Sequence, residues 1–149
     1  APAPVGCAWC ARLCSTEICG RSSKQNDAMR RYLNMVTRKE NIRPIIKEQM
    51  RGGDGRAVQT PVIDEAQFCG HGRLFAKMTL EPGCSIGWHE HHGESETFYI
   101  LAGAARYCDN GEWVTLRAGD CAYTPSGEGH SIANAGTQPL EFMALIVKA

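Results

Sequence analysis

The sequence predicts an all-β domain built as an antiparallel barrel or a double-sheet jelly roll. From about residue 57 onward, short segments in which apolar and polar residues alternate are separated by turn residues at regular intervals. Such alternation indicates strands that bury one face. In residues 73–80, for example, every second residue from Leu74 to Leu80 is apolar. Helical periodicity is nearly absent from this part of the chain, so seven or eight short strands are expected.

The expected strands follow one another with short turns between them. The sequence EPG at 81–83 is typical of a turn. Asp109, Asn110 and Gly111 predict a hairpin, because Asn-Gly readily adopts the positive φ angles of a tight two-residue turn. Residues 44–50 are expected to form a helical turn or short helix that the glycines of 51–55 end. From residue 73 onward, strands are expected at 73–80, 84–91, 96–103, 104–108, 112–116, 121–125, 130–136 and 140–149.

The first 35 residues differ in composition from the rest and are expected to be a disordered N-terminal extension. The domain itself is expected to span residues 36–149, with a barrel core at about 60–149. Within the extension, four cysteines have the spacing C-x2-C-x3-C-x4-C, which suits a zinc or iron–sulfur site. No second C-x2-C pair follows, and the segment from Met35 resembles a natural start, so a leader or a non-native extension is favoured. The four cysteines are Cys7, Cys10, Cys14 and Cys19.

Charge and composition narrow the function classes. The formal net charge is zero, but residues 1–60 hold eleven Lys and Arg against five Asp and Glu, and the remainder has the reverse excess. The basic residues lie in a weakly patterned segment, so no nucleic-acid partner is expected. No apolar run approaches the length of a membrane helix and no signal peptide is recognised, so a soluble, cytoplasmic protein without membrane contact is expected.

The segment HEHHGESE, residues 89–96, concentrates three histidines and three glutamates in eight positions. In a strand, residues two apart point to the same face, so His89 and His91 are expected to project together. Glu96 opens the next expected strand, and two imidazoles and a carboxylate that converge suit a transition metal or zinc. His130, which follows the turn sequence PSGEG, is the candidate for a fourth ligand.

With these residues placed, the chain resembles the cupin family. The first cupin motif, G-x5-H-x-H-x4-E-x6-G, is matched by Gly83, His89, His91, Glu96 and Gly103. The second motif, G-x5-P-x-G-x2-H-x3-N, is matched by Gly119, Pro125, Gly127, His130 and Asn134. Residues 104–118 separate the two motifs, a short spacing typical of small single-domain members. The resemblance covers about residues 60–149 and implies a double-stranded β-helix.

The resemblance also implies a site. His89, His91, Glu96 and His130 are expected to bind one divalent metal ion per subunit inside the barrel, with manganese, iron, zinc and nickel left open as its identity. One or two coordination positions are expected to stay open for water or a small-molecule ligand. By strand phase, Phe98, Ile100 and Ile132 are candidate pocket residues beside the metal, and the loop residue Glu94 is a further candidate that could reach the mouth of the site as an acid or base. Lys77, His92 and the aromatic residues Trp88, Tyr99, Trp113 and Tyr123 are expected to face away from the ligands.

Two functions remain open from the sequence. One is a metal-dependent enzyme that acts on a small organic acid or sugar-like ligand by decarboxylase, isomerase or dioxygenase chemistry. The other is a non-catalytic binder of a small molecule or metal. The chain is similar to oxalate-decarboxylase-like cupins, but Ile86 stands where the two-domain oxalate decarboxylases have an arginine. The family also implies a homodimer, in which a strand from residues 36–65 crosses to the partner.

Overall fold

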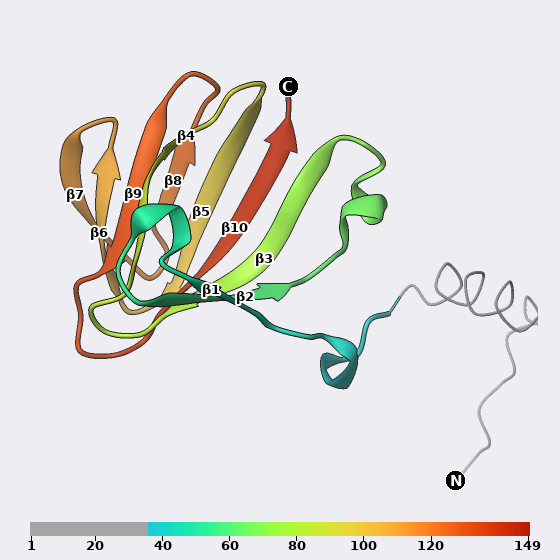
Figure 1. Cartoon of the computed structure of the whole chain (residues 1–149), viewed down its shortest axis with the longest axis horizontal. Coiled ribbons are helices and arrows are strands. Elements are labelled where there is room, and N and C mark those ends of the chain that lie inside the picture. The colour runs from blue at the N-terminus through green and yellow to red at the C-terminus, as the bar shows by residue number, and fades with distance from the viewer. Residues whose placement is uncertain (1–35) are drawn as a thin grey trace, which may run out of the picture. The chain divides into compact units, whose positions relative to one another are not determined.

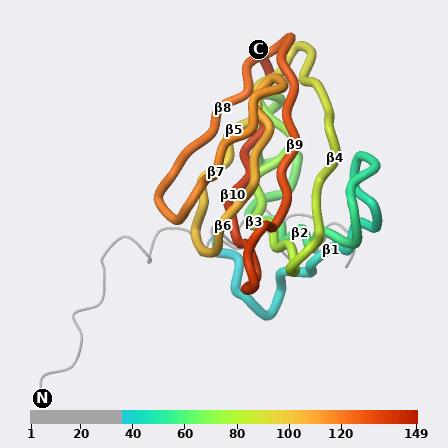
Figure 2. Tube along the Cα trace, turned by 90° about the vertical axis from the view of Figure 1, so that its left-hand side faces the viewer, coloured from blue at the N-terminus to red at the C-terminus, as the bar shows by residue number. Residues whose placement is uncertain are grey.

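Two antiparallel β-sheets form the fold (Figure 1). The computed structural model describes residues 36–149. Cysteines 7, 10, 14 and 19 and the expected extension 1–35 lie outside these residues, so the predictions about them stay predictions. Within the described part, none of the helices is long and apolar enough to span a membrane. The sheets face each other as a double-stranded β-helix, the jelly-roll architecture that the sequence predicts (Figure 2).

The first sheet has six strands in the order β1-β2-β3-β10-β5-β8. Its members are β1 (Ile45–Glu48), β2 (Arg56–Pro61), β3 (Gly72–Leu80), β10 (Leu140–Lys148), β5 (Glu94–Ala102) and β8 (Cys121–Thr124). The second sheet has four strands in the order β4-β9-β6-β7. Its members are β4 (Ser85–Glu90), β9 (Gly129–Asn134), β6 (Ala104–Asp109) and β7 (Glu112–Arg117). Three short 3-10 helices complete the described chain: η2 (Lys39–Asn41), η3 (Met50–Gly52) and η4 (Glu65–Phe68).

Alternate residues of the strands point between the sheets and form one hydrophobic core. Along β10, which lies between β3 and β5, Leu140, Phe142 and Ala144 are almost fully buried and their neighbours face outward. Ile86 and Ile132, which pair across β4 and β9, join the same core from the other sheet. Removing these side chains from water is the main favourable term that holds the sheets together.

The hairpin between β6 and β7 is confirmed. Asp109 pairs with Glu112, so Asn110 and Gly111 alone form the turn. Both residues have positive φ, 48° and 100°, as the tight turn requires. On its other side, β6 pairs with β9, and Tyr107 lies opposite Ile132. The Tyr107 side chain is buried and points inward toward the site described below.

The prediction of a helical turn at 44–50 was wrong. Residues Ile45–Glu48 form strand β1, which pairs with β2 from Ile45–Gln59 to Glu48–Arg56. Two adjacent isoleucines favour extended backbone, and pairing with β2 outweighs the helical propensity of the residues that follow. Strands β1 and β2 extend the sheet of their own chain through β3. The expected homodimer with a crossing strand stays a prediction.

Asn134 ties the end of β9 to the opposite sheet. Its side-chain amide donates to the main-chain oxygens of Leu80, 2.8 Å away, and Gln138, 2.9 Å away. Its carbonyl oxygen accepts from the Gly136 main-chain nitrogen at 2.9 Å. Because Asn134 is only 4% exposed, water cannot replace these partners. The amide therefore joins β9, the turn after it and the end of β3.

Replacing Asn134 with alanine removes three hydrogen bonds and leaves buried main-chain groups unpaired. We expect Asn134→Ala to lower the free energy of unfolding by about 2–4 kcal/mol. Urea denaturation followed by circular dichroism measures this change. Gln138→Ala is the control, because Gln138 is exposed and contributes its main-chain oxygen, which the substitution retains. A loss no larger than that of the control would contradict the bracing role of Asn134.

Candidate metal centre

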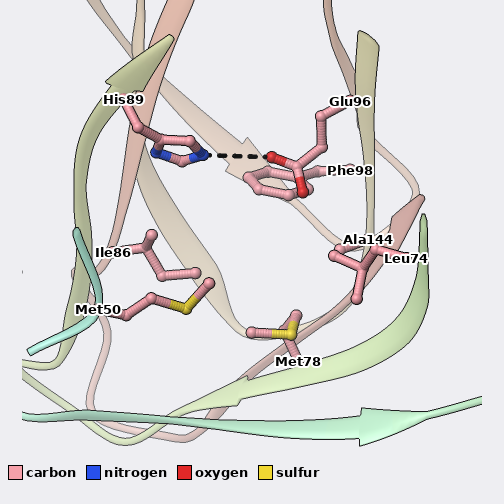
Figure 3. Close-up of a pocket in the computed structure, with 8 residues that line it drawn as sticks. All are labelled: Met50, Leu74, Met78, Ile86, His89, Glu96, Phe98 and Ala144. Carbon is pink, nitrogen blue, oxygen red and sulfur yellow. Dashed lines mark ion pairs between the residues drawn. The ribbon is translucent and has the colours of Figure 1, made fainter. Parts of the chain in front are cut away.

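Four side chains from three strands meet between the two sheets. His89 lies near the end of β4, His91 directly follows that strand, and His130 lies on β9 opposite His89. Glu96 comes from β5 in the facing sheet. The pairing of β4 with β9 shifts register between Ile86 and His89, so a bulge turns this end of β4. Figure 3 shows His89 and Glu96 pointing toward each other across the pocket.

The atoms that could bind a metal lie close together. The Nε2 atom of His130 is 3.1 Å from the Nε2 atoms of both His91 and His89. The Oε2 atom of Glu96 is 2.9 Å from His130 Nε2, 3.2 Å from His91 Nε2 and 3.5 Å from His89 Nε2. One ligand atom from each of the four residues lies within 4.8 Å of the others.

Hydrogen bonds on the far side of two rings orient their Nε2 atoms toward this centre. His89 Nδ1 lies 3.0 Å from the main-chain oxygen of Gly87, and His91 Nδ1 lies 3.1 Å from Glu94 Oε1. Both oxygens accept hydrogen bonds, so each Nδ1 carries the proton. In the neutral rings, each Nε2 therefore presents its lone pair to the centre, as a metal-binding imidazole requires.

The third ring is held by two hydroxyl groups. His130 Nδ1 lies 3.0 Å from both Tyr107 Oη and Thr124 Oγ1, and the two hydroxyls are 2.9 Å apart. Burial lowers the pKa of His130 and so favours the neutral imidazole that binds metals. Phe98 stacks on the His130 ring with 4.9 Å between the ring centroids. Tyr107 shares the inward phase of Ala105 in its strand, so strand alternation could have identified it from the sequence.

Glu96 is the buried charge of the site. The residue is 4% exposed, and among the described residues its Oε2 atom is a buried side-chain oxygen with no hydrogen-bond partner. Burial acts to raise the pKa of Glu96, but the three histidine nitrogens hold that pKa below its ordinary value. An ionised carboxylate therefore lies beside three imidazole nitrogens, and a buried charge of this kind needs a cation.

A small apolar pocket adjoins the four residues. The open space among its lining residues, adjoining solvent included, is about 220 Å³, and about 10 Å³ of it admits the centre of a water-sized molecule. Its lining consists of Met50, Leu74, Met78, Ile86, His89, Glu96, Phe98 and Ala144 (Figure 3). Among the expected pocket residues, Phe98 belongs to this lining. Ile100 and Ile132 lie instead in the core, where they are almost fully buried and pair with Phe142 and Ile86.

Comparison with known proteins identifies the family. A family model described as a cupin domain matches residues 76–147. The oxalate-binding protein of Thermotoga maritima is 43% identical over 119 residues, which are 80% of this chain and 98% of that protein. The chain belongs to the cupin family. This cupin also resembles the crystal structure of a predicted oxalate decarboxylase from Thermotoga maritima, with a TM-score of 0.74 and 43% identity over 77% of this chain and all of that one.

A more distant relative carries the same domain in a longer chain. The oxalate decarboxylase of Bacillus subtilis is 35% identical over 75 residues, which are 47% of this cupin but 20% of that protein. The aligned part thus corresponds to one cupin domain, and the likeness does not extend to the rest of the decarboxylase.

The residues of this cupin fit a divalent metal ion. Three neutral imidazoles and one carboxylate form an N3O set, a combination that zinc, iron, manganese and nickel all accept. Without a cation, the set leaves an unpaired carboxylate oxygen and a buried negative charge. The four residues therefore form a group able to bind a metal, as the cupin motifs imply.

Glu94, an expected pocket residue, faces the outer side of the centre instead. Arg73 on β3 donates to both of its carboxylate oxygens, with 2.7 Å between Arg73 Nε and Glu94 Oε2. This ion pair, together with the His91 hydrogen bond, lowers the pKa of Glu94 to about 2. Glu94 is absent from the pocket lining and serves to orient His91. The sequence did not indicate Arg73, because only the β3–β10–β5 order brings it near.

The residues expected to face away from the ligands do so. His92 is largely exposed and its Nε2 atom lies 3.2 Å from a carboxylate oxygen of Glu90. Lys77 pairs with Glu141 on the outer face of the six-stranded sheet. The four aromatic residues Trp88, Tyr99, Trp113 and Tyr123 are 45–61% exposed.

The hydroxyls behind His130 yield a test of this arrangement. In a Tyr107→Phe, Thr124→Val double variant, His130 Nδ1 loses both partners while the four ligand residues remain. We expect metal affinity to fall about 10–100-fold, because partners of this kind fix the tautomer and orientation of a ligating histidine. Competition with a metal-binding dye measures the affinity. Tyr123→Phe removes an exposed hydroxyl as the control. Equal affinities in the double variant and the control would contradict the role of the two hydroxyls.

Proposed function

We propose that this cupin holds one divalent metal ion at His89, His91, Glu96 and His130 and binds a small chelating carboxylate, such as oxalate, at the open side of the metal. The observation that carries the proposal is the unpaired, buried oxygen of Glu96, surrounded by three imidazole nitrogens at the edge of a pocket. The name of the Thermotoga maritima relative, an oxalate-binding protein that the chain covers almost entirely, supports the choice of ligand.

Charge in the pocket favours an anion only when the metal is present. The four ligand residues alone contribute one negative charge, that of Glu96. A bound divalent ion reverses the sign of the site and supplies open coordination positions for two oxygens of a ligand. None of the described lining residues is a lysine or an arginine, so the metal is the cation that attracts the carboxylate. Ligand binding should therefore depend strictly on the metal.

The size and polarity of the pocket favour a small acid over a sugar. The space open to a water-sized molecule is about 10 Å³, far below the roughly 300–1,000 Å³ of pockets that enclose drug-sized ligands. Apart from His89 and Glu96, the lining consists of aliphatic, thioether and aromatic side chains. Sugar hydroxyls would find few hydrogen-bond partners there, and buried polar groups without partners are costly. A compact acid instead directs its oxygens to the metal.

The same lining favours binding over decarboxylation. Cleaving oxalate into carbon dioxide and formate breaks the C–C bond and places a proton on the remaining carbon, so a proton donor must reach that carbon. Of the described lining residues, His89 and Glu96 alone carry an ionisable side chain, and both are assigned to the metal. Glu94 is held by Arg73 and His91 outside the lining. We therefore assign this cupin a binding function.

Titration calorimetry with oxalate tests the proposal on the metal-free protein and on protein loaded with manganese, iron, zinc or nickel. We expect oxalate to bind the loaded protein in a one-to-one ratio and not the metal-free protein. His91→Ala should lose both the metal, as measured by elemental analysis, and oxalate binding. His92→Ala replaces the adjacent, exposed histidine and should retain both.

Two results would change the assignment. Equal oxalate binding with and without metal, or no binding with any of the four metals, would overturn the proposed function. Release of formate over many turnovers from loaded protein would replace binding by catalysis, with the proton donor then to be sought beyond the pocket lining.

A further inference from the structure

Met50 comes from far upstream of the other pocket residues and closes the pocket on one side. It lies in η3 and precedes the segment 76–147 that matches the cupin family model. In Figure 3 its side chain lies below Ile86 and points across the pocket toward Met78. Met50 is partly buried and packs against the hydrophobic core. Its side chain thus occupies space next to the metal ligands without contributing a donor atom to them.

The backbone around Met50 is held in an unusual conformation. Gln49 and Arg51, on either side of it, have φ angles of 45° and 56°. Residues with side chains seldom adopt this left-handed region, and they stay there when surrounding contacts fix them. Here the Gln49 main-chain nitrogen donates to Gly55 O at 2.8 Å, and the Gly52 nitrogen donates to Gln49 O at 2.9 Å. These bonds close residues 49–55 into a loop, called here the Met50 loop.

The Met50 loop is docked on β4, the strand that carries His89. The Ser85 main-chain nitrogen donates to Asp54 O at 2.8 Å, and the Asp54 nitrogen donates to Ser85 Oγ at 2.7 Å. A methyl group at Gly87 would overlap the Arg51 carbonyl oxygen, so the close approach requires glycine there. The position of Met50 is therefore fixed relative to the metal centre, and its side chain forms a stable wall.

We propose that Met50 sets the size limit of the ligand, so that the pocket admits oxalate and the shortest 2-oxo acids and excludes acids with longer alkyl chains. This inference rests on the proposed function, since a 2-oxo acid would chelate the metal as oxalate does. The wall opposite the ligand atoms consists of Met50, Met78, Ile86 and Leu74, all apolar. Space freed at Met50 would accept an alkyl group, whereas a second carboxylate there would be buried without a partner.

The test compares the wild type with Met50→Ala, both loaded with metal, by titration with oxalate, pyruvate and 2-oxopentanoate. In the wild type we expect pyruvate to bind more tightly than 2-oxopentanoate. In Met50→Ala the affinity for 2-oxopentanoate relative to pyruvate should rise about 16-fold, since 2-oxopentanoate has two more methylenes and each buried methylene contributes about 4-fold in affinity. Metal content should stay close to the wild-type value, because Met50 contributes no donor atom to the metal residues.

Met143→Ala is the matched control, because Met143 lies on β10 between the inward-facing Phe142 and Ala144 and points outward. It should leave the preference between the two 2-oxo acids unchanged. The same preference in Met50→Ala as in the wild type would overturn the size limit.

A second measurement decides the role of Met50 if no acid binds the wild type and the proposed function fails. Apolar cavities bind xenon without any metal or charge. Crystals of Met50→Ala under xenon pressure should show xenon between Met78 and Ile86, and crystals of Met143→Ala should show none there. An unfilled site in Met50→Ala would mean that the Met50 side chain does not limit the pocket, whatever the ligand is.

Discussion

The buried carboxylate of Glu96 is the group on which the rest of the site depends. A charge in a hydrophobic interior is strongly unfavourable unless opposite charge or hydrogen bonds surround it. Here Glu96 comes from one sheet and the three imidazoles come from the end of β4 and from β9 in the other, so both sheets must meet for the carboxylate to be neutralised. The hydrogen bonds behind the rings of His89 and His91 place the proton on Nδ1, so their Nε2 atoms can bind a cation, which is the partner that completes the site. The metal centre therefore forms only when the two sheets pack together.

Strand β4 connects the metal centre to the ligand pocket. Its Gly87 serves two contacts: the carbonyl oxygen orients His89, and the absence of a side chain lets the Met50 loop approach. Ile86, next to it, contributes to the pocket wall. One irregular stretch of a strand therefore determines the direction of a metal ligand and the position of the opposite wall. The bulge between Ile86 and His89 changes the direction of side chains that a regular strand would point elsewhere.

The sequence predicts the parts of this design that depend on local spacing. His89, His91, Glu96 and His130 could be named because strand alternation and the two motifs fix their relative phase, and the β6–β7 turn follows from Asn110 and Gly111. The pocket could not be derived in the same way. Met50 reaches the pocket through a loop docked on β4, and Arg73 reaches Glu94 through the β3–β10–β5 order. Ile100 and Ile132 share the inward phase of the ligands yet lie in the core. Strand phase tells which face a side chain occupies but not which part of a barrel it lines.

The polar metal centre and its mostly apolar pocket differ in composition, and this difference bears on whether the site is suited to binding or to catalysis. Among the described residues, the Nδ1 atoms of the three histidines contact groups that orient the rings, whereas Glu96 Oε2 has no hydrogen-bond partner. Apart from His89 and Glu96, the adjoining space is lined by hydrocarbon and sulfur. A catalyst for proton transfer needs a titratable group with a free position beside the substrate. A binding site needs a fixed geometry, a charge of the right sign and walls that reject larger molecules. The three strands, the hydroxyls behind His130 and the docked Met50 loop supply the second set of properties. Under the proposed function, selectivity for a small acid would follow from fixed geometry around a single charged group.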